Sequence, residues 1–230
     1  KLIKAVRMDE HSVTARAEAA EMILLTLVRA EENDIPLTRD DLARELNGLP
    51  APDLQSLTSQ SLISLDGDAL TLTAAGRARA TALLRRHRLV ERHLTDVVGL
   101  DWTRAHEEAD KLEHTVSAEE EQTLAAQLGN PATCPHGNPI PDAVRGEPTT
   151  ARMALTALAE CAAHTRGVIA RINAETPDAL RHLATLGLLP DVAVVVENQA
   201  PFGGPVLVRV GHSHYALGRD LATRIWIKPQ

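Results

Sequence analysis

The stretch that decides the fold runs from Thr38 to Thr73 and reads TRDDLARELNGLPAPDLQSLTSQSLISLDGDALTLT. A cap-like threonine followed by acidic residues predicts a helix over 38–46, which Asn47-Gly48 ends. A second helix is predicted over 52–62, with a proline near its first position. Residues 63–73 alternate apolar and polar side chains around an Asp-Gly pair, which predicts a β-hairpin. Helix, short turn, helix and hairpin together predict a winged helix-turn-helix.

Further helices are predicted on both sides of this stretch, from the spacing of apolar residues and from capping residues. Asp101 is the predicted cap of one of them, and Ser117 with Glu120 three residues later predicts a capping box for another. The predicted ranges are 15–32, 73–98, 102–116 and 118–128. Residues 129–150, rich in Pro and Gly, predict an ordered loop followed by a linker and therefore a domain boundary.

The C-terminal part is predicted to be a small barrel of the SH3-like type. Its short β-rich runs are separated by turn residues, and one helix that Thr176 caps and Gly187 ends interrupts them. The runs are 167–172, 192–197, 206–210 and 224–227. The predicted fold class is therefore α+β, with a winged helix over 1–82, a helical domain for dimerisation and metal binding over 83–150, and the SH3-like domain over 151–230.

Composition narrows the function. The chain of 230 residues is 44% hydrophobic and 24% charged, and it contains no apolar run that approaches the roughly 18 residues of a membrane span. Residues 1–16 lack the features of a secretory signal, so we expect a cytoplasmic protein. Cys134 and Cys161 cannot form a disulfide framework. The net charge of -7 does not favour binding to DNA, whose phosphates are negative. Ten histidines and 31 acidic residues supply potential ligands for divalent metals.

The helix predicted over 102–116 carries a pattern of potential metal ligands. His106, Asp110, Glu113 and His114 are spaced so that all four project from one helix face. In the preceding helix His87 and Glu91 are spaced i, i+4, and a short connection folds the two helices back on each other. Imidazole and carboxylate groups together favour Mn, Fe, Ni or Zn, so we predict a transition-metal site.

Two other interpretations of these residues remain open. Such side chains can form a solvated helix face with ordinary ion pairs. A metallohydrolase would need His-Glu-x-x-His on one helix, and His106-Glu107-Glu108-Ala109-Asp110 has Asp in place of the second His. No serine or cysteine nucleophile has a partnered base at a recognisable spacing, so catalysis is the minority interpretation.

At these residues the sequence resembles the diphtheria toxin repressor family of metal-dependent regulators, together with its manganese-responsive relatives. The resemblance rests on the predicted winged helix, the segment 87–101, the Glu113-His114 pair, the loop 137–141 and the SH3-like domain. It implies a homodimer that binds a palindromic DNA operator when metal is bound, and that represses metal-uptake genes.

The resemblance also implies two metal sites. The first would consist of Met22, Asp110, Glu113 and His114, and the second of His87, Glu91 and His106 with Glu175 and Asp178 from the SH3-like domain. Manganese-responsive relatives add a Cys-Pro-His loop, which here gives Cys134 and His136. The archetype that senses iron has cysteine in place of Asp110, and this hard ligand tilts the expectation to Mn(II), while the soft Met22 favours Fe(II). Met22 can alternatively be a core residue.

The predicted DNA-reading helix departs from the family, because residues 46–76 contain neither Lys nor Arg. Gln55 aligns with the base-contacting glutamine of the family, a residue type that can pair with adenine. The other predicted contact residues are Ser56, Ser59, Arg39, Arg44 and Arg77. The unusual reading helix leaves open an alternative, in which the protein buffers metal and has weak or lost DNA binding.

Overall fold

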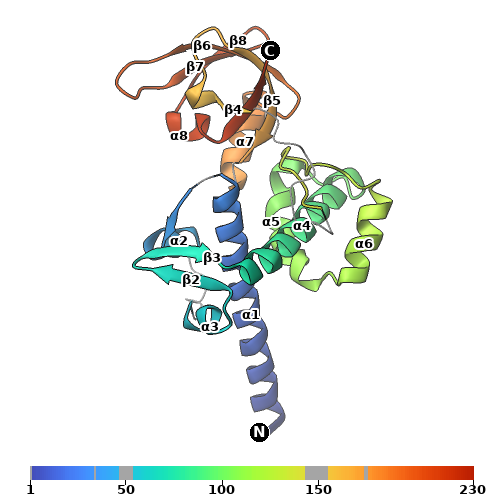
Figure 1. Ribbon diagram of the computed structural model, residues 1–230. Helices are drawn as coiled ribbons and strands as arrows, with labels where there is room; N and C mark the ends of the chain where they lie inside the picture. The colour runs from blue at the N-terminus through green and yellow to red at the C-terminus, as the bar shows by residue number, and fades with distance from the viewer. Residues whose placement is uncertain (1, 34, 47–53, 143–154, 174–175) are drawn as a thin grey trace. The chain divides into compact units, whose positions relative to one another are not determined.

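The computed structural model describes residues 2–33, 35–46, 54–142, 155–173 and 176–230, with only the backbone described for 2–15. These residues form two compact units (Figure 1). One contains the residues up to Arg85 with Pro141, and the other contains Arg86–Ile140 and the C-terminal residues up to Gln230. None of the described helices is both long enough and apolar enough to span a membrane.

The first unit contains a winged helix-turn-helix. Its sheet has the order β1-β3-β2 and is antiparallel throughout, and the turn of the hairpin places Gly67 at a φ of 60°. A buried cluster of leucines and isoleucines from the helices and the hairpin forms the core. The elements are α1 (Leu2–Glu32), β1 (Leu37–Thr38), α2 (Arg39–Glu45), α3 (Leu54–Ser59), β2 (Ile63–Asp66) and β3 (Ala69–Leu72).

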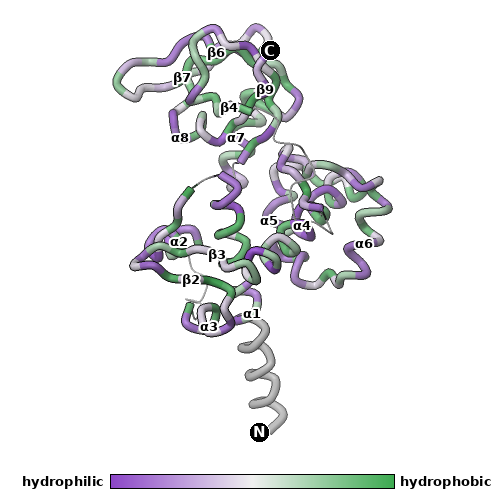
Figure 2. Tube along the Cα trace, viewed as in Figure 1, coloured by the Kyte–Doolittle hydropathy of each residue, from purple (hydrophilic) through white to green (hydrophobic). Residues whose placement is uncertain are grey.

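The predicted caps and helices of this unit occur with altered ends. Thr38 caps α2 in a capping box with Asp41, with 3.2 Å from the Asp41 N–H to the Thr38 hydroxyl. Helix α1 begins at Leu2 instead of the predicted residue 15. Residues 2–14 contain neither Gly nor Pro, so their sequence contains no residue that would interrupt the helix. The coloured part of α1 in Figure 2 contains hydrophobic positions, and its buried residues include Ile23, Leu24 and Leu25.

The helical part consists of α4 (Ala74–Asp96), α5 (Trp102–Leu112), the 3₁₀ turn Glu113–Thr115 and α6 (Ala118–Gln127). Asp101 caps α5, and the capping box between Ser117 and Glu120 begins α6, as predicted. The helix predicted to reach residue 116 instead ends at Leu112 and tightens into the 3₁₀ turn, which is a common form of helix end. Glu113 and His114 therefore follow the α-helix and do not continue its face.

The C-terminal part is a curved antiparallel sheet of the SH3-like type, in the order β4-β9-β5-β6-β7-β8. It closes over a core of buried aliphatic side chains, and hydrophobic and hydrophilic positions mix along its strands (Figure 2). The elements are β4 (Thr156–Ala157), η2 (Leu158–Glu160), β5 (Arg166–Ile172), α7 (Pro177–Thr185), β6 (Ala193–Gln199), β7 (Val206–Val210), β8 (Ser213–Leu217), α8 (Arg219–Ala222) and β9 (Ile225–Pro229).

The sequence patterns missed two of these strands. Strand β4 is only two residues long, which is too short to show an alternation. Strand β8 lies at the edge of the sheet and buries only Leu217, so its sequence Ser-His-Tyr-Ala-Leu lacks the apolar positions that mark a strand. The predicted α+β class and its three kinds of domain are confirmed, whereas the exact domain boundaries stay a prediction.

Candidate metal centre

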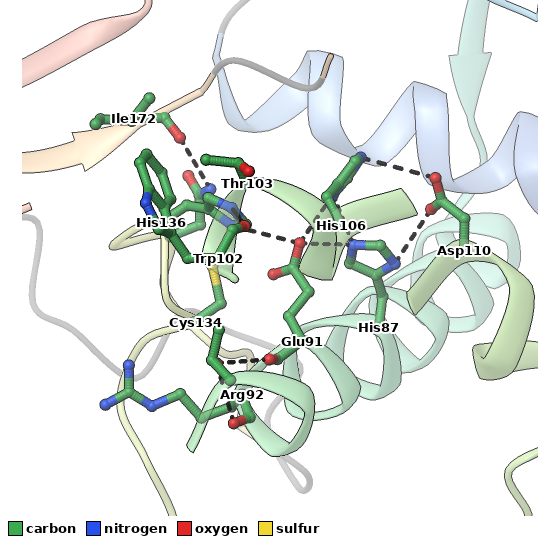
Figure 3. Close-up of polar contacts among 12 residues, drawn as sticks. His87, Glu91, Arg92, Trp102, Thr103, His106, Asp110, Cys134, His136 and Ile172 are labelled. Atoms are coloured by element: carbon green, nitrogen blue, oxygen red, sulfur yellow. Dashed lines mark hydrogen bonds and ion pairs between the residues drawn. The ribbon is translucent and has the colours of Figure 1, made fainter. Parts of the chain in front are cut away.

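Helices α4 and α5 bring three potential ligands to one point. His87 and Glu91 lie one turn apart on α4 and are both buried, and His106 approaches them from α5. His87 Nε2 lies 3.0 Å from Glu91 Oε1, His106 Nδ1 lies 2.8 Å from the same oxygen, and the two nitrogens are 3.0 Å apart (Figure 3). Two donor atoms about 2.1 Å from one ion and at right angles to each other are about 3 Å apart, so this triangle fits a metal ion.

A second group of ligands faces the other nitrogen of the His87 ring. His87 Nδ1 lies 2.5 Å from Glu113 Oε2 and 3.3 Å from Asp110 Oδ1. Glu113 is fully buried, and its other oxygen, Oε1, has no hydrogen-bond partner among the described residues, although His114 Nε2 lies 3.7 Å away. A buried carboxylate oxygen without a hydrogen bond is costly, and a bound cation would compensate it. This chemistry also fits a metal.

The Cys-Pro-His loop brings a third set of donors to the same carboxylate. Cys134 Sγ lies 3.8 Å from His136 Nδ1, which in turn lies 3.4 Å from Glu91 Oε1. All three side chains are buried, and Glu91, Cys134 and His136 have ligand atoms within 4.8 Å of one another. Figure 3 shows Glu91 between His136 on one side and the His87–His106 pair on the other.

Backbone contacts hold this loop in place. The other ring nitrogen of His136, Nε2, lies 3.0 Å from the Trp102 carbonyl oxygen, and the His136 carbonyl accepts a hydrogen bond of 2.9 Å from the Ile172 N–H in β5. Gly137 has a φ of 82°, and a Cβ there would lie 2.0 Å from the Ala170 carbonyl oxygen. The loop therefore fits between α5 and β5 only with glycine at this position.

Charge interactions reinforce the cluster. Burial works to raise the pKa of Glu91, but the nearby His87 and His136 and the hydrogen bond with His106 outweigh it and hold that pKa well below its usual value. Burial works to lower the pKa of His136, yet the charge of Glu91 and the hydrogen bond with Cys134 hold it well above its usual value. In this state Glu91 is a buried anion that histidines neutralise, and a divalent cation satisfies the same requirement.

Three further predicted metal ligands remain: one lies in the other unit, one is exposed, and one lies outside the described residues. Met22 lies in the first unit, packed against the apolar core of the winged helix, and its role as a ligand stays a prediction. Asp178 is exposed and pairs with Arg181 instead. Glu175 lies outside the described residues.

The predicted DNA-contacting residues lie in the first unit, and several of them contact other residues of that unit. Ser59 donates to the Ser56 carbonyl oxygen, whereas Gln55 on the same helix is exposed. Arg44 forms an ion pair with Asp41, and both guanidinium nitrogens of Arg77 that face Glu31 lie within 2.9 Å of its carboxylate. Arg39 is exposed. Phosphate contacts from Arg44 and Arg77 would therefore compete with internal ion pairs.

The sequence reasoning missed the groups that orient the ligands, because they act through the backbone or through the fold. Trp102 contributes its carbonyl oxygen, and the Asp101 cap that begins α5 was the one available signal for its position. Arg88, buried on α4, donates to the Pro139 carbonyl oxygen at 2.5 Å and ties the loop to the helix. A lone arginine inside a basic helix gives no such signal in the sequence.

Two protein families match parts of the chain. Residues 73–142 match the family described as "Iron dependent repressor, metal binding and dimerisation domain", and residues 156–229 match the FeoA domain. The first match contains every ligand of the cluster described above. The second covers the SH3-like sheet.

Curated relatives and solved structures extend the similarity over 92% of the chain. The iron-dependent repressor IdeR of Mycobacterium tuberculosis is 34% identical over 225 residues, which cover 92% of this chain and 97% of the relative. The diphtheria toxin repressor of Corynebacterium diphtheriae is 37% identical over 54% of this chain and 57% of its own length. A manganese-dependent transcriptional repressor in complex with manganese has a TM-score of 0.83 and 32% identity, covering 92% of this chain and 100% of that structure.

Proposed function

Since the chain belongs to the diphtheria toxin repressor family of metal-dependent regulators, we propose that it is a DNA-binding transcriptional repressor activated by Mn(II) or Fe(II). It acts as a homodimer on a palindromic operator, in the cytoplasm, and controls metal-uptake genes. The single observation that carries this proposal is the buried triangle of His87, Glu91 and His106, whose donor atoms have the spacing of ligands around one ion.

The chain offers residues for both predicted sites. His87, Glu91 and His106 would hold one ion, and Asp110, Glu113 and His114 would hold another together with Met22. A bound divalent ion supplies positive charge that compensates these carboxylates. Glu91 and Glu113 are both buried, and both contact the ring of His87. Two buried carboxylates this close together favour the binding of a cation between them and their histidine partners.

The proposed repressor has two states, one without bound metal and one with it, and the ligand side chains distinguish them. In the structure, the carboxylates of Glu91, Asp110 and Glu113 each lie close to His87. With metal, Met22 on α1 and the ligands on α5 would share an ion, which fixes the spacing of two winged helices across the dimer. A difference in metal affinity of a few kcal/mol between the two states shifts such an equilibrium more than tenfold.

The donor set favours Mn(II) slightly. Asp110 is a hard ligand, and its neighbours are carboxylates and imidazoles, which suit both Mn(II) and Fe(II). Relatives carry both names, since IdeR is called iron-dependent and the solved repressor structure described above is called manganese-dependent. The relatives are repressors and not enzymes, and we propose that this chain likewise has no catalytic activity.

The test measures operator binding by the full chain with and without Mn(II). The readout is the fluorescence anisotropy of labelled promoter DNA. We expect Mn(II) to increase the affinity more than tenfold, and the increase to be lost in His106→Ala. His214→Ala is the matched control, because His214 also pairs with a carboxylate, Glu197, but lies exposed in the SH3-like sheet. Metal binding without DNA binding would support the buffering alternative and contradict the repressor.

A further inference from the structure

The 3₁₀ turn that follows α5 is contacted by an arginine from another helix. Glu113 begins this turn, and its N–H donates to the Ala109 carbonyl oxygen in α5. The Glu113 carbonyl oxygen accepts a hydrogen bond of 3.4 Å from the Val116 N–H, and Arg86 Nη1 donates to the same oxygen at 3.4 Å. Arg86 lies on α4, directly before the predicted ligand His87. The guanidinium therefore contacts the backbone of the residue that carries a second predicted ligand.

This contact matters because the end of α5 is an unfavourable place for a carboxylate. A helix C-terminus carries partial negative charge, and Leu112, which precedes the 3₁₀ turn, supplies no capping side chain. Glu113 adds a carboxylate there, and it is fully buried. An arginine near a helix C-terminus stabilises it, through hydrogen bonds to the last carbonyl oxygens and through its positive charge. Arg86 supplies this stabilisation from the neighbouring helix.

A carboxylate on α6 orients the Arg86 guanidinium. Glu121 Oε2 lies 3.5 Å from Arg86 Nε, and the side chains of Arg86 and Glu121 are only 19% and 14% exposed. Partly buried ion pairs are screened less than surface pairs, and removing one partner leaves a charge without compensation. The planar fork of arginine allows Nε to face Glu121 while Nη1 donates to the Glu113 carbonyl oxygen. Helix α4, the 3₁₀ turn and α6 thus meet at one side chain.

We propose that Arg86 and Glu121 are positioning residues of the metal centre. Glu121 orients the Arg86 guanidinium, and the guanidinium fixes the backbone of Glu113. The Glu113 carboxylate then stays beside His87, where Oε2 lies 2.5 Å from His87 Nδ1. Arginine offers only hydrogen-bond donors, so Arg86 acts on a bound ion through Glu113. The inference deepens the proposed function and rests on it, because it assumes that Glu113 binds metal.

These contacts give α6 an influence on metal binding. Helix α6 contains none of the predicted ligands, but it supplies Glu121. A change in the position of Glu121 would therefore alter the geometry of Glu113 without altering any ligand. Coupling of this kind is reciprocal, so metal binding should in turn order Arg86 and the start of α6.

The test measures two quantities on the full chain. One is the Kd for Mn(II) by calorimetry, and the other is backbone hydrogen exchange in chelator-treated protein. The variants are Arg86→Gln, Glu121→Gln and the double variant. Glu119→Gln is the matched control for the carboxylate, because Glu119 lies in the same first turn of α6 but is exposed. Arg104→Gln is the control for the arginine, because Arg104 is exposed and pairs with Glu108 within α5.

We expect Arg86→Gln and Glu121→Gln each to weaken Mn(II) binding about tenfold, the size of effect expected from losing a hydrogen bond to a charged group. In metal-free protein, exchange in residues 113–116 should become faster while the rest of α4 and α5 stays protected. The double variant should bind Mn(II) as Arg86→Gln does, because Glu121 acts through Arg86. Both controls should match the unaltered chain.

Three results would overturn the proposal. The double variant could lose as much binding free energy as the two single variants together, which would mean that Glu121 acts independently of Arg86. Arg86→Gln could leave the Kd unchanged, or exchange could rise throughout α4 and α5, which marks a general loss of stability. The exchange measurement needs no metal, so it tests the contact of Arg86 with the turn even if the unaltered chain binds no Mn(II). Failure of this inference and failure of the proposed function are therefore distinguishable.

Discussion

The metal cluster and the winged helix satisfy their polar groups in opposite ways. In the cluster, buried groups such as Glu91 and Glu113 face several partners at once, and Glu113 keeps an oxygen without a hydrogen bond. In the winged-helix unit, exposed charged groups such as Arg44 and Arg77 form ion pairs, as Arg77 does with Glu31. The ligand chemistry is therefore visible in the isolated chain, whereas DNA recognition depends on a partner that must displace existing contacts.

This difference has an energetic consequence. Buried ionisable groups are expensive without a compensating charge, so a cation bound at the cluster contributes strongly to the stability of its surroundings. Exposed ion pairs contribute about 0–1 kcal/mol to stability, so replacing them with phosphate contacts changes the free energy little. Metal should change this molecule far more than the loss of any single DNA contact.

The largest expected effect is therefore on stability. Mn(II) at about 1,000 times its Kd should stabilise the metal-binding region by about 4 kcal/mol, because it binds the folded state only. Hydrogen exchange should show the added protection in α4 and α5 and much less in the hairpin of β2 and β3. The gain should vanish with a chelator and in His106→Ala. Equal protection in the wing would break the contrast between the two regions.

A smaller effect is expected at the reading helix. Gln55→Ala should weaken operator binding by about 1–3 kcal/mol, because a glutamine that pairs with a base supplies discrimination of that size. Metal affinity should not change, since Gln55 lies in the winged helix and outside the metal cluster. The matched control is Gln122→Ala, an exposed glutamine on α6. If both variants bind the operator equally well, Gln55 does not read a base.

The sequence could predict elements whose signal is local. Thr38 with Asp41, and Ser117 with Glu120, fixed the starts of two helices because a cap needs only neighbouring residues. It could not predict the 3₁₀ turn at Glu113, because the burial of that carboxylate against His87 is a contact between residues 26 positions apart. Strand β8 was missed for the related reason that pairing with β7, and not its own apolar content, makes it a strand.

The residue types of the candidate site could be predicted from the sequence, but which of these side chains lie together could be predicted only in part. Helical spacing placed His87 with Glu91 and His106 with Asp110 on shared faces, and the structure brings these four side chains together. The spacing could not indicate that the loop residue His136 approaches the same oxygen of Glu91, because a loop has no periodicity from which to predict direction. The contacts of Ile172 and Trp102 that orient this loop are made by the backbone, which residue identity does not reveal.

The smallest expected effect concerns the ion pair between Arg77 and Glu31. If Arg77 leaves Glu31 to contact a phosphate, Arg77→Ala should reduce the salt dependence of operator binding by a slope of about 0.9. Glu31→Ala should then strengthen binding slightly, by under about 1 kcal/mol, because the pair is exposed and weak. Both quantities come from anisotropy titrations at several salt concentrations. If both variants leave the slope unchanged, the arginine stays in its internal pair, and the winged helix relies on backbone N–H groups and uncharged side chains.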